Sequence, residues 1–190
     1  MRRGRAIPAV TPEALEKAAL AYLERYASSA ENLRRVLMRR VVRAARAHPS
    51  DEGAMVRAEG VARIGAVIDR LVARRLLDDK LYAEARARSL SRQGRAASVI
   101  ARRLQVKGVA AEEVDGALTA LVEDGHSDLA GALRLARKRR LGPFRAAAER
   151  GERRTRDMAA LGRAGFSFEI ARRVVDAESA EALEAEIAAG

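Results

Sequence analysis

The chain of 190 residues contains no cysteine and no tryptophan, and only 3% of its residues are aromatic. Without cysteine it can form neither a disulfide nor a thiolate metal site. No apolar run approaches the roughly 20 residues of a membrane-spanning helix. The basic start, Met1–Arg5, lacks the apolar segment that an export signal needs. We therefore expect a cytoplasmic protein whose core is built from Leu, Val, Ile and Ala.

Positive charge dominates the composition. Lys and Arg together number 37 against 26 Asp and Glu, which gives a net charge of +11. Such an excess favours a polyanionic partner and long-range electrostatic steering. An arginine- and alanine-rich composition can also follow from the base composition of a genome. The basic residues are segregated along the chain, however, and this segregation favours a functional explanation.

Proline is scarce, with four residues, whereas the strong helix formers Ala, Leu, Arg and Glu are abundant. Apolar residues recur at helical spacing, and no stretch alternates between apolar and polar residues as a strand does. Thr11-Pro12-Glu13 has the form of a helix start, with a cap, a first-turn proline and an acid. We predict an all-α protein of nine helices, the third over about 54–77 and the last four over about 111–123, 127–141, 144–164 and 167–176.

An internal repeat links two helix ends. Leu104–Val109 and Leu161–Phe166 share the form Leu, three residues, Gly and a large apolar residue, with a spacing of 57 residues. Because three short helices cannot bury their apolar faces alone, such units are expected to stack. We predict three tandem three-helix, helix-turn-helix-like repeats stacked into an elongated arch. Their predicted ranges are 14–78, 79–125 and 126–176, between a flexible basic tail (1–13) and an acidic C-terminal tail (177–190).

Two segments resemble the RecX family of recombination regulators. Leu76-Leu77-Asp78-Asp79-Lys80-Leu81-Tyr82-Ala83, followed by an Arg-rich helix and the Leu104…Lys107-Gly108 stop, is similar to the family's central signature. Leu20–Ser28 resembles the family's opening Leu-x-x-Arg-x-x-Ser helix. The resemblance covers about 15–176. It departs at Arg95-Ala96, where the family has Gly-Pro, and in the first unit, which lacks its Gly and carries an insertion around 42–55.

The resemblance implies a monomeric regulatory protein that has no catalytic residues or cofactor. Members of the family bind the RecA–DNA filament and limit the ATPase, strand-exchange and coprotease activities of RecA. Single- or double-stranded DNA is then an auxiliary contact. The alternative is a free-standing helix-turn-helix-type DNA-binding protein. Against it, no helix carries a compact set of Asn, Gln and Arg suited to reading base edges.

Basic residues cluster in the second and third predicted repeats. Positions 86–107 hold seven basic and no acidic residues, and 134–156 hold ten basic and two acidic ones. The spacing of Arg88, Arg92 and Arg95 predicts one helical face, and Arg134, Arg137 and Lys138 share another. A phosphate backbone or an acidic protein groove would neutralise these charges, although a solvated face with counterions is the simpler explanation. The predicted partner-binding residues are Arg86, Arg88, Arg92, Arg95, Arg102, Arg103, Lys107, Arg134, Arg137, Lys138, Arg139 and Arg140.

Two acidic segments and a few possible catalytic groups lie outside the basic clusters. Positions 109–130 and 176–186 are acidic and contain no basic residue, and the acidic surface around Glu112–Asp128 is the alternative partner surface. Asp78 and Asp79 are interpreted as a helix cap and a first-turn acid rather than a catalytic pair. His48 and His126 lack metal-ligand spacing, and no phosphate loop or nucleophile pattern is present. We expect no catalytic residue and no metal site.

Overall fold

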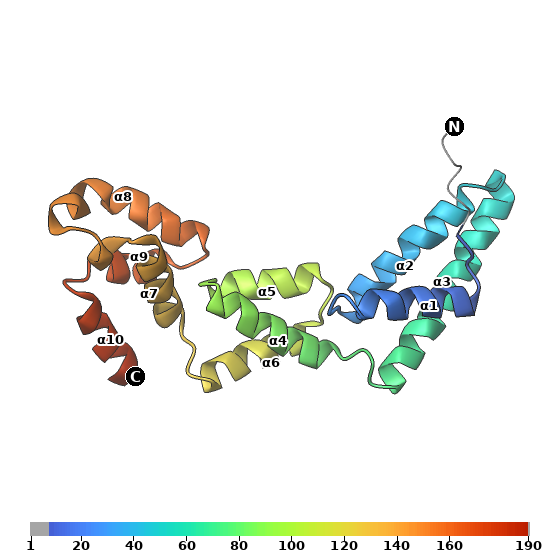
Figure 1. The fold of residues 1–190 in the computed structure, drawn as a ribbon, viewed down its shortest axis with the longest axis horizontal. Helices are drawn as coiled ribbons and strands as arrows, with labels where there is room; N and C mark the ends of the chain where they lie inside the picture. Colours follow the sequence, from blue (N-terminus) through green and yellow to red (C-terminus); the bar gives the residue numbers. More distant parts are fainter. Residues whose placement is uncertain (1–7, 190) are drawn as a thin grey trace. The chain divides into compact units, whose positions relative to one another are not determined.

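In the computed structural model, which describes residues 8–189, ten α-helices and one 3-10 turn follow one another (Figure 1). No residue of this described range lies in a β-strand, so the prediction of an all-α protein is confirmed. The helices are α1 (Pro12–Leu23), α2 (Ala30–Ala45), α3 (Ser50–Ala73), α4 (Asp79–Arg92), α5 (Ala97–Val106), α6 (Ala111–Glu123), α7 (Asp128–Arg139), the 3-10 turn η1 (Gly142–Phe144), α8 (Ala147–Arg163), α9 (Phe168–Val175) and α10 (Ala180–Ala189).

Side-chain caps determine where several of these helices begin. Thr11 Oγ1 accepts a hydrogen bond from the Ala14 amide at 3.2 Å, and Asp78 Oδ1 accepts one from the Leu81 amide at 2.9 Å. Ser127 caps α7 in the same way. Each cap satisfies an amide that has no partner inside its helix. The capping interpretation of Asp78 is therefore confirmed.

The chain folds into two compact units. The first runs to Tyr82 and includes Lys107–Val109, and the second contains the remainder. In the first unit, α2 packs along α3, and α1 packs on both. Leu15, Leu37 and Ile64 are fully buried between these three helices. Gly60 brings α3 close to α2, because a Cβ at this position would overlap the side chain of Val41.

The core of the second unit lies mainly between α7, α8, α9 and α10. Leu133, Leu161 and Val174 are buried there, together with Phe166, the apolar residue that follows a helix-ending glycine. Helices α5 and α6 pack against each other in this unit. Buried apolar residues on both helices, including Leu104 of α5, line their contact.

The third helix is displaced from its predicted range. It begins at Ser50, directly after Pro49, and carries Asp51 in its first turn, where the helix dipole favours an acid. It ends at Ala73 because Arg75 adopts a left-handed φ of 55° and the chain turns away. Arginine rarely adopts such a φ, so no residue near this position indicates that the helix ends here.

Both predicted tails contain structure. Residues 177–190 were expected to form an acidic tail, but α10 occupies most of this segment and buries Leu183 in the second unit. Residues 1–7 of the predicted basic tail lie outside the described residues, and Val10 is buried in the first unit. The boundaries of the three repeats and their stacking into an elongated arch stay predictions.

Candidate protein and nucleic-acid interface

The second predicted repeat carries four fully available cations. Arg86 and Arg92 on α4 and Arg102 and Arg103 on α5 are exposed, and none of them forms an ion pair within residues 8–189. Their guanidinium groups therefore remain free for a partner. An arginine can bind a carboxylate or phosphate through two parallel hydrogen bonds, so these four residues retain the chemistry predicted for them.

Arg88 has a structural contact instead. Its Nε donates to Asp124 Oδ2 at 2.9 Å, and one of its terminal nitrogens lies 3.5 Å from Glu84. The hydrogen bond to Asp124, followed by the charge of Asp124, raises the pKa of Arg88 above its ordinary value. Arg88 thus ties α4 to the end of α6, and its charge is already balanced by two carboxylates.

Arg95 does not share a helical face with Arg88 and Arg92, so that prediction was wrong. Helix α4 ends at Arg92, Gly94 takes a left-handed φ of 72°, and the Arg95 amide turns back to the Leu90 carbonyl at 3.2 Å. The Nε of Arg95 is buried and has no hydrogen-bond partner in the described part of the chain. Helical spacing does not place Arg95 beside Arg92, because the backbone reverses direction at Gly94, before it reaches Arg95.

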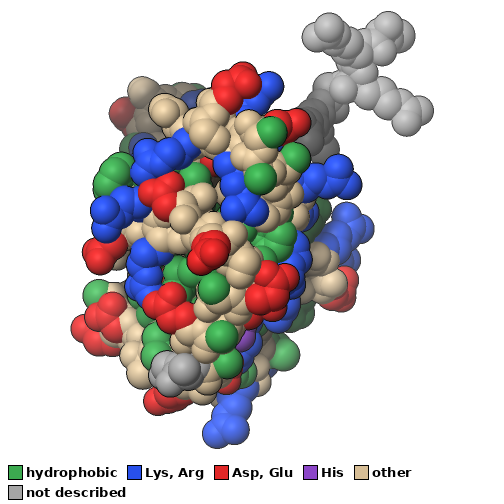
Figure 2. All heavy atoms as spheres, turned by 90° about the vertical axis from the view of Figure 1, so that its left-hand side faces the viewer, with side chains coloured by type: hydrophobic (Ala, Val, Ile, Leu, Met, Phe, Trp, Pro, Cys, Tyr) green, Lys and Arg blue, Asp and Glu red, His purple; other side chains and the backbone are tan. Residues whose placement is uncertain are grey.

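The basic stretch of the third predicted repeat is partly neutralised. Arg137 pairs with Glu184 of α10, and its guanidinium carbon lies 5.3 Å from the centre of the Phe144 ring. Arg134 lies 3.5 Å from the hydroxyl of Ser91. Figure 2, which faces the side where Figure 1 draws α8 and α10, shows basic and acidic side chains interspersed. In this stretch, the exposed cations without an ion pair in the described structure are Arg134, Lys138, Arg139, Arg140 and Arg156.

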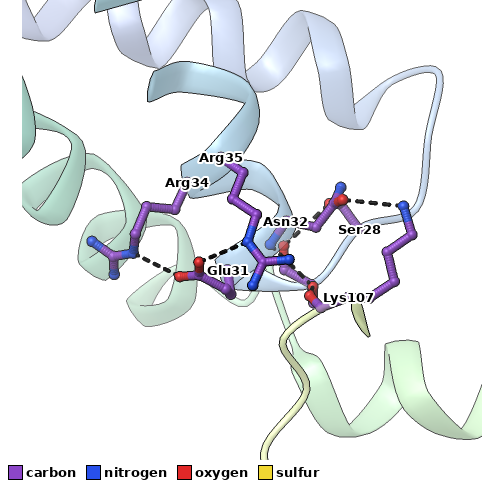
Figure 3. A network of polar contacts seen from close by, with 7 residues as sticks. Ser28, Glu31, Asn32, Arg34, Arg35 and Lys107 are labelled. Carbon is purple, nitrogen blue, oxygen red and sulfur yellow. Dashed lines mark hydrogen bonds and ion pairs between the residues drawn. The ribbon is translucent and has the colours of Figure 1, made fainter. Parts of the chain in front are cut away.

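Lys107, another predicted partner-binding residue, takes part in a cluster of hydrogen bonds at the start of α2, which we call a polar joint. The hydroxyl of Ser29 donates to the Lys107 carbonyl, and Lys107 Nζ donates to Asn32 Oδ1 at 3.1 Å (Figure 3). Asp79 Oδ1 accepts the amide of Ala30 at 2.7 Å. Within the first unit, Lys107 is therefore held against the start of α2, and Asp79 caps a helix other than its own.

The same joint recurs at the start of α5. Asp128 Oδ1 accepts the Ala97 amide at 2.8 Å, and the hydroxyl of Ser98 donates to the Gly165 carbonyl at 3.1 Å. In both joints the first residue of one helix, Asp79 of α4 or Asp128 of α7, caps the start of another helix, α2 or α5. A serine at that helix start donates to a carbonyl of a glycine-containing turn. Gly108 and Gly165 have φ values of 77° and 97°, as their predicted role as helix stops requires. The internal repeat is thus also a repeat of contacts.

One buried charge escaped the sequence analysis. Asp157 on α8 is 1% exposed and accepts hydrogen bonds from the Gly142 amide and from two nitrogens of Arg145, at 2.7–2.9 Å. Burial by itself raises the pKa of Asp157. The hydrogen bonds from Arg145 and Gly142, with the charges of Arg145 and Arg153, outweigh burial and hold this pKa below its ordinary value. The pair fixes η1 against α8.

No other arrangement in the described range suggests chemistry. Within residues 8–189, no group of three or more His, Asp or Glu side chains is placed to hold a metal ion. His48 lies 3.5 Å from Glu52, and His126 contacts the carbonyl of Asp124. None of the helices in this range is both long enough and apolar enough to cross a bilayer. The absence of a catalytic site stays a prediction.

Comparisons with known proteins point to one family. The family model described as "RecX, second three-helix domain" matches residues 78–118, which cover α4, α5 and part of α6. The regulatory protein RecX of Myxococcus xanthus (strain DK1622) is 44% identical over 172 residues, 90% of this chain and 89% of that protein. The regulatory protein RecX of Agrobacterium fabrum (strain C58 / ATCC 33970) is 40% identical over 106 residues, 56% of this chain and 55% of that protein. No solved structure matches the chain.

Proposed function

The chain belongs to the RecX family of regulatory proteins, and we propose that it binds the RecA–DNA filament and lowers the ATPase, strand-exchange and coprotease activities of RecA in recombination and DNA repair. The observation that carries this proposal is the identity of 44% over nine tenths of the chain and of its relative. A likeness of this extent includes every predicted repeat. In this proposal the protein acts by binding alone, as a cytoplasmic monomer without a cofactor.

Exposed cations on α4, on α5 and at the end of α7 form the proposed contact surface. Its strongest members are the residues whose charge is not balanced by a neighbour in the described structure. They are Arg86, Arg92, Arg102, Arg103, Lys138, Arg139 and Arg140. A charge that lacks an internal partner loses no ion pair when it binds. Arg88 and Arg137 would first have to release Asp124 and Glu184, so we assign them secondary roles.

The test is RecA-dependent ATP hydrolysis on single-stranded DNA, measured with and without this protein. We expect inhibition at a substoichiometric ratio to RecA, because a regulator of a polymer needs few copies if it blocks the end or the groove. Unchanged hydrolysis at an equimolar ratio would contradict the proposal. Stimulation would support a RecA-directed role but overturn its negative sign.

Charge reversal tests the surface. The variant Arg86→Glu/Arg92→Glu/Arg102→Glu should keep its helical circular dichroism, since exposed charges contribute less than about 1 kcal/mol each to stability. If about three phosphate-type contacts are lost, the slope of log affinity for the filament against log salt should fall by roughly 2–3. A control variant, Arg25→Glu/Arg156→Glu/Arg163→Glu, changes the net charge equally. Equal inhibition by both variants would refute the proposed surface.

The helix-turn-helix alternative makes a different prediction. A free-standing DNA-binding protein of that type binds a preferred duplex sequence in the absence of RecA and has no effect on RecA that is independent of that sequence. Selection from a random duplex library without RecA distinguishes the two. Enrichment of a defined sequence would favour the alternative.

A further inference from the structure

Helix α2 carries a basic face that the proposed RecA contact does not use. Between Asn32 and Asp51 the sequence contains six arginines and no acidic residue. These arginines are Arg34, Arg35, Arg39, Arg40, Arg43 and Arg46. All of them lie in α2 or directly after its end, in the first unit. The stretch therefore has a higher density of arginine than positions 86–107, which the sequence analysis selected.

Two adjoining grooves follow this face. One, of about 610 Å³, is lined by Met38, Val42 and the arginines 35, 39, 43 and 46. The other, of about 660 Å³, shares Val42 and Arg46 with the first and continues across the α2–α3 turn to Arg57 and Val61. Both are open hollows with a mostly apolar lining, and arginine side chains are among the residues that line them. The two hollows share Val42 and Arg46 and lie side by side on the α2–α3 pair, and we call them together the α2 groove.

The cations of the α2 groove lack partners. Arg39, Arg43, Arg46 and Arg57 are exposed, and the described chain offers none of them an ion pair. Arg35 is the exception, with its Nε 2.9 Å from Glu31 (Figure 3). Like charges three or four residues apart destabilise a helix. Helix stability therefore does not account for this row of arginines, whereas an anionic partner does.

The spacing of the row suits a regular polyanion. Arg35, Arg39 and Arg43 follow one another at intervals of four residues, which corresponds to about 6 Å along the helix axis. Arg46 continues the row after three residues. Guanidinium groups bind phosphate oxygens through two hydrogen bonds at once. A linear row of such groups can therefore contact successive phosphates of one strand.

The chemistry of the face indicates which nucleic acid it suits. Residues 33–62 contain no Phe, Tyr or Trp, so they offer no ring on which the bases of a single strand could stack. They also contain no Asn or Gln, the side chains that pair with adenine edges. A duplex needs neither feature, because its bases are already stacked inside it and its phosphates face outward. We infer that the α2 groove binds the phosphate backbone of double-stranded DNA without reading its sequence.

This site does not depend on the RecA-directed function. Duplex binding is measured with no RecA present, and RecA inhibition is measured separately with the same variants. Failure of duplex binding would leave the proposed regulation of RecA intact, and the reverse also holds.

The experiment measures binding of the full chain to a fluorescent duplex of about two helical turns. The variant Arg39→Glu/Arg43→Glu/Arg46→Glu removes three of the unpaired cations, and Arg25→Glu/Arg156→Glu/Arg163→Glu serves as the control of equal net charge. We expect the first variant to lose at least about tenfold in affinity at 50 mM salt and about 2.7 in the slope of log affinity against log salt. The control should lose much less. Arg39→Gln/Arg43→Gln/Arg46→Gln keeps helix formers on α2 and guards against misfolding.

Three results would overturn the inference. In the first, both reversals weaken duplex binding equally, so only net charge matters. In the second, a single strand of the same length binds at least as tightly through the same three arginines. In the third, polyglutamate displaces the duplex as efficiently as unlabelled duplex does, which would make the α2 groove a docking surface for an acidic protein segment. Selective loss of duplex binding, preserved circular dichroism and weak competition by polyglutamate together support it.

Discussion

Replacing Asp157 by asparagine is expected to destabilise the protein strongly at neutral pH. Asparagine has nearly the same shape, but it presents an amide nitrogen to a pocket that contains only donors, the Gly142 amide and two nitrogens of Arg145. Breaking a buried ion pair by removing one partner costs about 3–5 kcal/mol. For a chain of this size the melting temperature should fall by roughly 6–20 °C.

A second ion pair on α8 supplies a matched control. Arg154 donates two hydrogen bonds to Asp176, at 2.7 and 2.6 Å, in the same two-pronged geometry. The two side chains are 46% and 40% exposed, however, whereas Asp157 is 1% exposed. Exposed pairs contribute about 0–1 kcal/mol. Asp176→Asn should therefore lower the melting temperature by only a few degrees, so the comparison isolates the effect of burial.

The difference between wild type and Asp157→Asn should depend on pH. The pKa of Asp157 in the folded protein lies below its ordinary value of 3.8. A carboxyl group whose pKa is lowered by folding stabilises the protein fully above the pKa of the unfolded chain, about 3.9. This stabilisation is lost as the pH falls through the folded-state pKa. The stability curves of wild type and variant should therefore converge below about pH 4.

Urea unfolding followed by circular dichroism, at a series of pH values, measures both effects. The double variant Asp157→Asn/Arg145→Gln should be less destabilised than the sum of its single variants, because it leaves no unpaired guanidinium. The reasoning would be refuted if Asp157→Asn cost no more than Asp176→Asn. A gap between wild type and Asp157→Asn that stayed constant from neutral to acid pH would refute it equally.

Two further changes test the joints and the helix ends. Asp79→Ala and Asp128→Ala should each cost about 1 kcal/mol, as the loss of a helix cap does, and should speed hydrogen exchange of the amide that each carboxylate holds. Unaltered exchange at both amides would show that the joints contribute nothing. Gly165→Ala should cost about 2–5 kcal/mol in urea unfolding, because its φ is 97° and a Cβ would overlap Val99. Its control, Gly162→Ala, lies in α8 with open space around it and should stabilise by about 0.5–1 kcal/mol. Equal effects of the two glycine substitutions would contradict the argument.

Local chemistry made most of the fold predictable. Thr11, Asp78 and the glycines at 108 and 165 act within a few residues of their own position, and the structure shows them in the roles that the sequence indicated. The range of α6 was predicted without error for the same reason. Strong helix formers and regular apolar spacing left no competing structure.

The errors arose where tertiary contacts decide. Arg95 was counted on a helix face although the turn at Gly94 intervenes, and a spacing rule cannot detect a reversed backbone. Asp157 directly follows the basic stretch 134–156, and its local sequence is that of a solvated acid. Its burial could not be predicted, because its partner Arg145 becomes its neighbour only when η1 packs on α8. Helix α10 was predicted as part of an acidic tail because residues 176–186 contain five acids and no basic residue. Its apolar residues Ala180, Leu183 and Ile187 nevertheless pack it onto the second unit.

The repeated joint makes the protein extensible in principle. Residues 79–125 contain both halves of it. One half is Asp79 and the turn at Gly108, which contact the start of α2. The other half is the start of α5, which Asp128 caps. A duplicate of this segment, inserted after itself, would meet a compatible surface at each end. The start of α8 differs, since it has no side-chain cap and Arg150 spans to the Pro143 and Glu178 carbonyls at 2.9 and 3.0 Å. We therefore predict that a chain in which residues 79–125 are duplicated still folds, whereas the start of α8 offers no matching joint for a further unit.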